Sequence, residues 1–444
     1  MRMTNKEFRG KRLLVALCVG LLIGPAGCAR RAGKDSIGVS TNAPAANPGQ
    51  PVRVSPVDAD GAEPTVATTR DGTAYVAWVE HRGKEADVML ARVNQDGQPR
   101  GVPVRVNPKA GEATAWHGDP PTLAVATEGT LYVGWTARVE SAGGHANDLY
   151  LSASRDGGQT FAPPVKVNDD RKAGVHAMHS LAVSNDGRIY LAWLDERSGK
   201  PPSESQEGVE HRRMEGNREV FFSYSIDGGR TFSTNQRVAS DVCPCCKTSL
   251  AVARDGRVYA SWRQVLPGDY RHIGVSSSTD GGKTFSHPVI ASDDRWTISG
   301  CPVSGSALLA GAGGTLRVLW YTAGEAGQPG LYWSESHDGG KTFAPRKLLA
   351  GGPAHGTPVL VPDGGDGLAA VWEDSENGIP RVVTARFDDN SQGGDAMTLS
   401  GDGELPAAAA TADHLFVAYV AKNGEGRGIW VVTARKEKLS AKAG

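Results

Sequence analysis

Short apolar strands alternate with polar turns along almost the whole chain after residue 50. A typical pair is Pro64-Thr-Val-Ala-Thr68 followed, after a short turn, by Thr73-Ala-Tyr-Val-Ala-Trp78. Such pairs predict antiparallel hairpins. The pair recurs seven times, and an aromatic residue ends its second strand each time, at Trp78, Trp135, Trp193, Trp262, Trp320, Trp372 and Tyr419. No sustained helical periodicity follows residue 30, so the pattern predicts an all-β fold.

Two further strands follow six of these hairpins, and one of them ends in Pro103-Val-Arg-Val-Asn-Pro108. The seventh unit lacks its outermost strand, but Pro51-Val-Arg-Val-Ser-Pro56 copies residues 103–108 with one substitution. An N-terminal strand that completes the last unit would remove exposed sheet edges. We therefore predict a β-propeller of seven four-stranded blades over residues 51–436, closed by the N-terminal strand. Six blades remain the alternative if the last unit, residues 405–434, packs differently.

A second repeat is the octet Ser-x-Asp-Gly-Gly-x-Thr-Phe, which occurs four times between residues 154 and 343. The carboxylate can cap its own turn, the glycine pair supplies positive φ, and the aromatic side chain covers the turn. Degenerate copies lie around residues 94–97 and 388–394. The predicted structural aspartates are Asp156, Asp227, Asp280 and Asp338.

This octet resembles the Asp box of the sialidase-like, or BNR-repeat, β-propellers, and the resemblance covers essentially residues 51–436. In that family the box is a structural turn on the face away from the binding site. The resemblance therefore implies a fold and says little about chemistry.

The resemblance weakens where sialidase chemistry would be carried. In the family, an Arg-Ile-Pro motif in the first blade supplies the arginine that grips the substrate carboxylate. Here Pro64 aligns with the motif proline, and Ala62 stands where the arginine would be. Residues 80–82 and 87 match other family positions only weakly, and Tyr321 with Glu325 is the sole candidate for a nucleophilic pair. We therefore do not expect sialidase activity.

The N-terminus is typical of a secretion signal. A basic start precedes the apolar run of residues 13–23, which is too short for a membrane span. Ala26-Gly27-Cys28 resembles a lipobox with Cys28 as the lipidated residue, although Pro25 departs from the usual aliphatic residue. We predict a signal peptide over residues 1–27, then Cys28 and a flexible linker to residue 50, and a disordered tail over residues 437–444. Plain cleavage, which gives a soluble secreted protein, is the alternative.

These features place the folded body in the cell envelope, anchored by the N-terminal lipid and facing the periplasm or the outer membrane. A formal net charge of −1 over 444 residues gives no reason to expect nucleic acid as a partner. We predict a monomer whose protein or glycan ligand the sequence does not identify.

Candidate metal ligands occur in the loops that enter five successive units. A closed ring would gather these loops around its axis. Thiolate, thioether and imidazole together suit copper, and zinc is the next best fit. The candidate ligands are His117, His176, Met178, His179, Cys243, Cys245, Cys246, Cys301 and His355.

Each of these residues also has a simpler interpretation. Four cysteines in an oxidising compartment can form two disulfides, one of which could join two units through Cys301. The adjacent Cys245 and Cys246 are not expected to pair, since vicinal disulfides are strained. The histidines can be hydrogen-bonded loop residues, and Met178 can be a core side chain.

Two function classes therefore stand side by side. The first is an extracytoplasmic binding protein with a Cys/His/Met metal site on the loop face. The second is a divergent, exo-acting glycoside hydrolase that uses carboxylates such as Asp195 and Glu196. A solvated loop with a surface ion pair is the alternative for residues 195–197. An insertion over residues 198–217 is either a lid or partner-contact element or a disordered excursion.

Overall fold

The structure is a computed structural model that describes residues 48–140, 146–198, 218–298, 300, 302–364, 367–387, 396–423 and 426–436. The chain divides into two compact units, Met1–Asn42 and Ala43–Gly444, and every described residue belongs to the second. The predicted signal peptide, Cys28, most of the linker, residues 199–217 of the insertion, Cys301 and the tail lie outside the described residues. Within the described ranges, no helix is long and apolar enough to span a membrane.

The described part is all-β, and its strands form antiparallel sheets in chain order. The first sheet contains β2 (Asp60–Thr68), β3 (Ala74–Arg82), β4 (Glu85–Val93) and β5 (Val104–Arg105). The second contains β6 (Thr122–Val125), β7 (Leu131–Arg138), β8 (Asn147–Ser154) and β9 (Val165–Lys166). Next come β10 (His176–Val183), β11 (Ile189–Asp195), β12 (Arg218–Ser225) and β13 (Gln236–Val242), then β14 (Ser249–Val252), β15 (Val258–Leu266), β16 (Tyr270–Ser278) and β17 (Val289–Ile290). These last two sets form one eight-stranded sheet, joined through the single pair Val242–Gln264.

The remaining strands follow the same plan. One sheet contains β18 (Ser306–Ala310), β19 (Leu316–Thr322), β20 (Gly330–Ser336) and β21 (Lys347–Gly351). Another contains β22 (His355–Pro362), β23 (Leu368–Glu376), β24 (Ile379–Phe387) and β25 (Met397–Ser400). The last combines β26 (Gly403–Ala410), β27 (His414–Asn423) and β28 (Gly426–Arg435) with β1 (Val52–Arg53) from the start of the chain. In that pairing, Val52 lies opposite Val431 and Arg53 opposite Trp430.

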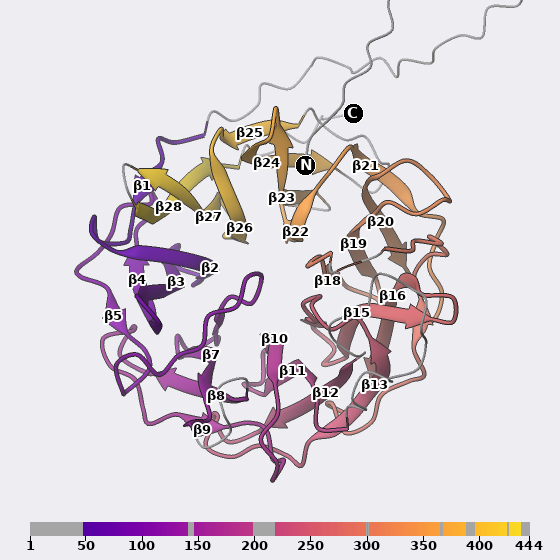
Figure 1. Ribbon diagram of the computed structural model, residues 1–444, viewed down its shortest axis with the longest axis horizontal. Coiled ribbons are helices and arrows are strands. Elements are labelled where there is room, and N and C mark those ends of the chain that lie inside the picture. The colour runs from indigo at the N-terminus through magenta and orange to yellow at the C-terminus, as the bar shows by residue number, and fades with distance from the viewer. Residues whose placement is uncertain are drawn as a thin grey trace, which may run out of the picture. The chain divides into compact units, whose positions relative to one another are not determined.

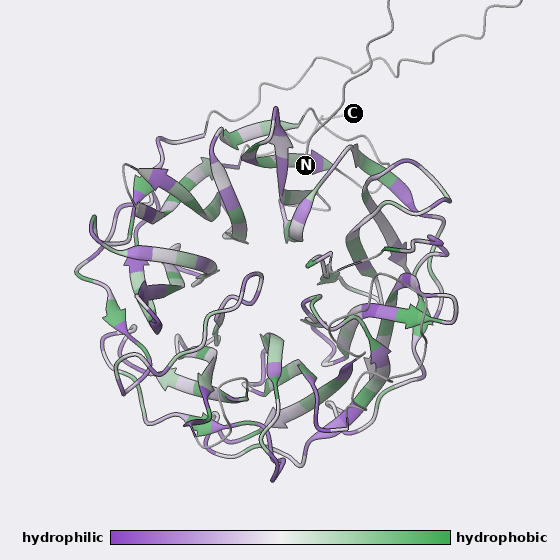
Figure 2. Ribbon diagram, viewed as in Figure 1, coloured by the Kyte–Doolittle hydropathy of each residue, from purple (hydrophilic) through white to green (hydrophobic). Residues whose placement is uncertain are grey.

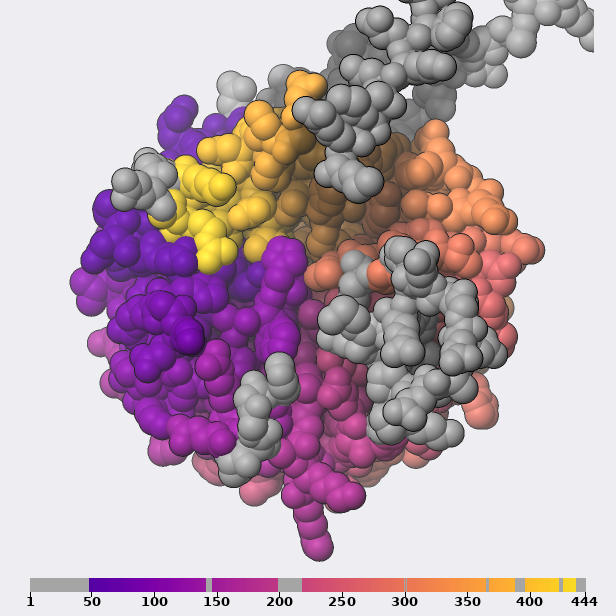
Figure 3. Space-filling model, in the orientation of Figure 1, coloured from indigo at the N-terminus to yellow at the C-terminus, as the bar shows by residue number. Residues whose placement is uncertain are grey.

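The sheets of this unit follow one another around a central region, as in a propeller (Figure 1). The innermost strands, such as β2, β10 and β22, point their beginnings toward the centre, and the short outer strands lie at the rim. The segment that leads into β6 reaches into the middle, and it occupies the centre of the face seen in the space-filling view (Figure 3).

The core lies between neighbouring sheets. All seven predicted aromatic residues at the ends of the second strands are buried, with exposed fractions of 3% or less. One apolar cluster joins Val76 and Trp78 of the first sheet to Val431 of the last, and another joins Val133 and Leu90 of the first two sheets. Many strands carry runs of apolar residues (Figure 2), and β7 and β11 are buried at nearly every position, as expected where both faces of a sheet pack on neighbours.

The Asp boxes have the predicted structure. In the third copy, Asp280 accepts hydrogen bonds from the backbone N–H groups of Lys283 and Thr284, at 3.0 Å each, and from the hydroxyls of Ser278 and Thr284. The same bonds recur at the other three copies. The degenerate copy at Asn94 replaces the carboxylate with an amide oxygen that accepts from two backbone N–H groups. The other degenerate copy falls on residues 388–395, outside the described part.

Candidate functional site

The innermost strands begin with a shared irregularity. The register slips near the start of β2, β10, β22 and β26, where an irregularity adds one residue in β2, β10 and β26 and two residues in β22. The bulges contain left-handed backbone at Glu63, Met178, Gly356 and Leu405, with φ between 51° and 66°. Such backbone is costly for residues other than glycine and clusters at functional sites. The bulges therefore mark the central edge of the sheets as the place to look for chemistry.

Ionisable side chains gather at this edge, and we call Glu63, His117, His355, Glu373 and Glu404 the charged hub. Glu63 is buried, and its Oε1 lies 3.5 Å from Nδ1 of the exposed His117. Glu373 accepts a 2.7 Å hydrogen bond from the backbone N–H of Leu405, the left-handed residue of β26. His355 lies opposite Glu373 in the register of β22 and β23. Residues from the first, second and last two sheets thus share one electrostatic environment.

The charges of the hub shift two of its own groups. The Glu63 carboxylate raises the pKa of His117 above its ordinary value, and the charges of Glu373 and Glu404 act in the same direction. Burial raises the pKa of Glu373, and the neighbouring Glu404 charge adds to that effect. The hub therefore pairs an imidazole that favours its charged form with a carboxyl group that holds its proton to higher pH than usual.

His176 lies instead in a buried ion network of the third sheet. Its Nε2 is 3.1 Å from Asp170 and 3.5 Å from Asp195, and its Nδ1 contacts the backbone oxygen of Asn147. Arg197 donates to Asp195 at 3.0 Å. The two carboxylates outweigh burial and raise the pKa of His176. Both ring nitrogens are engaged, so His176 does not fit the predicted role of a metal ligand.

The other two predicted residues of β10 are packed inside the protein. His179 is buried, and its Nδ1 lies 3.3 Å from Asp119, whose pKa is lowered by this contact despite burial. Lys247 donates to the backbone oxygen of His179 at 2.7 Å. Met178 is buried in an apolar cluster, and its backbone oxygen accepts from Thr248. Met178 thus occupies the core position that the sequence allowed as its simpler interpretation.

The cysteines form a separate group between β13 and β14. The sulfur atoms of Cys243, Cys245 and Cys246 all lie within 4.8 Å of one another, and all three side chains are buried. Among the described residues, they are the only group of three or more His, Cys, Asp or Glu side chains that could hold a metal ion. The predicted gathering of sulfur and imidazole around one axis is therefore not what the structure shows. Cys301 falls outside the described residues.

The redox state of this group limits what it can bind. Cys245 is disulfide-bonded, and Cys243 and Cys246 are free thiols. A half-cystine is not a thiolate ligand, so two thiols remain. Structural zinc takes four ligands and is not satisfied by two, whereas soft thiolates favour copper(I).

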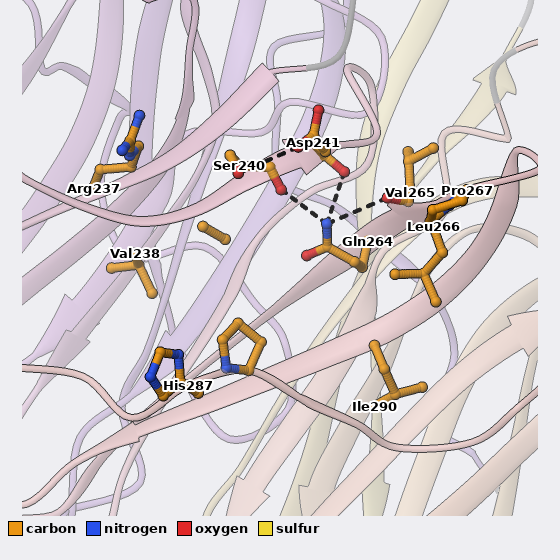
Figure 4. Close-up of a pocket in the computed structure, with 12 residues that line it drawn as sticks. Arg237, Val238, Ser240, Asp241, Gln264, Val265, Leu266, Pro267, His287 and Ile290 are labelled. Carbon is orange, nitrogen blue, oxygen red and sulfur yellow. Dashed lines mark hydrogen bonds between the residues drawn. The ribbon is translucent and has the colours of Figure 1, made fainter.

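A groove lies elsewhere, on the flank formed by β13, β15 and β17. Its volume is about 940 Å³, and Gln264, Asp241 and His287 line it (Figure 4). The Gln264 side-chain amide donates to the backbone oxygens of Ser240 and Asp241 at 2.8 and 2.9 Å. The Gln264 amide is thus used within the protein, and none of the groove's lining residues belongs to the charged hub.

Comparison with known proteins now places the chain. A family model described as the BNR repeat-like domain matches residues 72–386. The chain belongs to this BNR repeat-like family. The search of curated proteins found no match.

Solved structures resemble this BNR repeat-like protein in fold. A polysaccharide lyase of family PL25, an ulvan lyase, is 14% identical with a TM-score of 0.56, over 87% of this chain and 96% of the other. A protein of unknown function from Dyadobacter fermentans is 13% identical with a TM-score of 0.51, over 88% and 100%. The Hadza microbial sialidase Hz136 is 15% identical with a TM-score of 0.46, over 82% and 76%. At such identities the likeness shows the fold alone.

The remaining sequence candidates do not form a catalytic centre. Burial raises the pKa of Tyr321, and its ring packs edge-on against Trp296, so it is not activated as a nucleophile. Glu325 is exposed in a turn. Asp195 is fully buried and accepts from Trp193 at 2.8 Å, which corrects the expectation of a solvated loop.

The sequence contains one pattern that could have indicated the charged hub, although we used it for no prediction. Proline follows the irregular positions of several innermost strands, as in Glu63-Pro64, Thr357-Pro358 and Leu405-Pro406. Proline lacks an N–H and fits a place where the ladder is interrupted. Acidic residues beside these prolines, Glu63 and Glu404, are the carboxylates that the sequence interpretation missed.

Proposed function

We propose that this protein is an extracytoplasmic glycan-active propeller whose charged hub binds a saccharide and cleaves its glycosidic bond. The observation that carries the proposal is the buried Glu63 beside the exposed His117, with Glu373 and its raised pKa in the same cluster. Membership of the BNR repeat-like family supports it. A further similar structure, at 14% identity and a TM-score of 0.55, is an ulvan lyase bound to -[GlcA(1-4)Rha3S]-.

The chemistry asks for two carboxyl groups in different protonation states. Glu373 is the candidate general acid, because its raised pKa favours the protonated form that can donate to the leaving-group oxygen. Glu63 or Glu404 is the candidate partner that would activate water or act as the nucleophile. His117 is exposed and would contact the saccharide directly, through hydrogen bonds or its positive charge. Sialic acid is not the expected substrate, because Ala62 replaces the anchoring arginine.

The test is a panel of neutral and uronate-containing oligosaccharides assayed for reducing-end release, with binding measured by calorimetry. We expect Glu373→Gln to lower kcat about 100-fold or more while binding is retained. His117→Ala should weaken binding. Glu128→Gln, at an exposed turn, is the matched control and should leave both unchanged. Absence of binding and cleavage across the whole panel would refute the proposal.

The proposal includes the architecture and location predicted from the sequence. Seven blades, closed by β1 on β28, would bring the hub residues of the first and last sheets together.

Lipidation at Cys28 would hold the monomer at a membrane of the envelope. Replacing Cys28 with alanine should release the protein into the soluble fraction, and retention in the membrane fraction would contradict the anchor.

Copper or zinc is not part of this proposal, because the described histidines lie outside the cysteine group and Cys245 is disulfide-bonded.

A further inference from the structure

The segment Cys243-Pro-Cys-Cys246 brings three sulfur atoms into contact inside the protein. The Sγ atom of Cys246 lies 3.5 Å from that of Cys243, and the Sγ atom of Cys245 lies 3.9 Å from the same Cys243 sulfur. Cys243 and Cys246 are 1% exposed and Cys245 is 8% exposed. One sulfur that belongs to a disulfide is therefore within contact distance of a free thiol, which has a second thiol beside it.

Two buried arginines supply positive charge to this group. Arg271 of β16 donates from Nη1 to the Cys243 sulfur at 3.0 Å, and a carboxylate oxygen of Asp269 lies 3.3 Å from its guanidinium. Arg263 of β15 is equally buried, and it donates to the backbone oxygens of Ser304 and Tyr321. A guanidinium taken out of water needs a nearby anion, and a Cys243 thiolate provides one.

The thiols of the pair are unequal. The Cys246 thiol donates toward Cys243, and together with the charges of Arg271 and Arg263 it lowers the pKa of Cys243 to about 6. Burial and the Cys243 charge raise the pKa of Cys246 well above its ordinary value. One sulfur is thus prepared as a nucleophile and the other keeps its proton, which is the division of labour in Cys-x-x-Cys exchange sites.

We propose that Cys243, Cys245 and Cys246 form a disulfide-exchange relay that moves a disulfide between Cys245 and the buried Cys243–Cys246 pair. In the first step, the Cys243 thiolate attacks the Cys245 sulfur, a Cys243–Cys245 bond forms, and the former partner of Cys245 leaves as a thiolate that takes up a proton. In the second step, Cys246 transfers its proton to the departing Cys245 sulfur and attacks Cys243. Each step breaks one S–S bond and forms one, so no external oxidant is consumed.

The relay assigns the protein a thiol–disulfide activity that is independent of the charged hub. Cys245 is the least buried of the three sulfurs, so it is the position at which a small thiol or disulfide from solvent would exchange. The Cys243–Cys246 pair then stores or returns the oxidising equivalent. Thiolate stabilisation by the arginines favours the reduced pair, which makes its disulfide readily reducible.

Disulfide mapping by mass spectrometry tests the relay on the full-length protein. The protein is held at pH 4, moved to pH 7, and quenched in acid with N-ethylmaleimide at successive times. We expect only the disulfide on Cys245 at pH 4, where exchange is slow. At pH 7, where the Cys243 thiolate forms and exchange is fast, we expect a mixture of that disulfide and the Cys243–Cys246 disulfide. The exchange rate should rise about tenfold per pH unit up to the pKa of Cys243 and then level off.

Variants separate the steps. Cys243→Ser should leave the disulfide on Cys245 at every pH, and Cys246→Ser should stop after the first step and accumulate the Cys243–Cys245 bond. Arg271→Met should slow exchange about tenfold at pH 6. Arg295→Met, at an exposed arginine of the same region, is the matched control and should not change the rate. If a variant fails to fold, the pH series on the unaltered protein still decides the question.

Two results would overturn the relay. The first is a single disulfide connectivity that stays the same at all pH values and times. The second is stoichiometric copper or zinc in the purified protein that protects the cysteines from alkylation, because the group would then be a metal site. Neither result depends on glycan binding, so failure of the relay and failure of the proposed glycan activity can be told apart.

Discussion

The two edges of the sheets, the Asp-box turns and the beginnings of the innermost strands, differ in how well their polar groups are satisfied. Each complete Asp box saturates its carboxylate with backbone and hydroxyl donors, and each repeats the same geometry. The central edge has left-handed non-glycine backbone and buried polar atoms without hydrogen bonds, among them atoms of Asp119 and His179. The repeated edge stabilises the fold, and the irregular edge is where the chain departs from its own repeat.

This difference indicates that the repeated turns stabilise the fold, whereas the candidate functional residues lie at the opposite edge of the sheets. A turn that occurs four times cannot distinguish one sheet from another, whereas Glu63, His117 and Glu373 each occur in one sheet only. An irregular strand beginning is not always a functional site, however. The His176 network of the third sheet is irregular and internally paired, and His176 and Asp195 are buried in it, so we assign it to stability. Mutations at the two edges can test this division.

The largest effect is expected in the His176 network. Asp195→Asn removes the charge that faces both His176 and Arg197 while keeping the side-chain shape. Breaking a buried ion pair leaves uncompensated charge, so the free energy of unfolding should fall by about 3–5 kcal/mol. Denaturant titration measures the change. Asp186→Asn, at an exposed pair with Arg188, is the control and should cost less than about 1 kcal/mol.

The next largest effect tests whether the Asp-box turns stabilise the fold by packing against other strands. Gly282 of the third box has a φ of 88°, and a Cβ atom there would lie 2.8 Å from the ring of Phe222 of β12, in the preceding four strands of the eight-stranded sheet. Gly282→Ala should therefore lower the free energy of unfolding by about 2–4 kcal/mol through backbone strain and overpacking together.

Gly187→Ala isolates the backbone contribution, because Gly187 has a φ of 80° but open space around its Cβ position. It should cost about 1 kcal/mol. Equal losses at the two glycines would contradict the role of the box in packing against other strands.

A pH series gives a smaller effect at the central edge. The folded-state pKa of His176 is raised above 6.5, because Asp170 and Asp195 face its ring and outweigh burial and the nearby Arg197. The stabilisation is complete below pH 6.5 and is lost as pH rises through the raised pKa. His176→Asn should remove this decline, which amounts to about 1 kcal/mol per unit of pKa shift. His287→Asn, at an exposed histidine, should leave the decline unchanged.

The sequence predicted the fold well because its signals are local. The seven aromatic residues and the four octets each fix a strand end or a turn through neighbours within a few residues, and the copied strand at residues 51–56 pointed to the β1–β28 pairing. The site was harder because its members are contributed by distant segments. Cys243 and His117 lie in comparable loops, but their side chains point into different environments, which periodicity does not encode. Similarly, Asp195 looked solvated until Trp193 and His176 were placed around it.

The smallest effect separates a functional carboxyl from a structural one at the same edge. Burial raises the folded-state pKa of Glu373, so its charged form opposes folding above the ordinary value of 4.5. Glu373→Gln should therefore leave stability unchanged at pH 4 and raise it at pH 8 by less than about 1 kcal/mol, while the proposed activity is lost. Thermal unfolding at the two pH values measures the change, with Glu128→Gln as control. A loss of stability at pH 8 would instead make Glu373 a structural charge like Asp195, and the charged hub would lose its candidate acid.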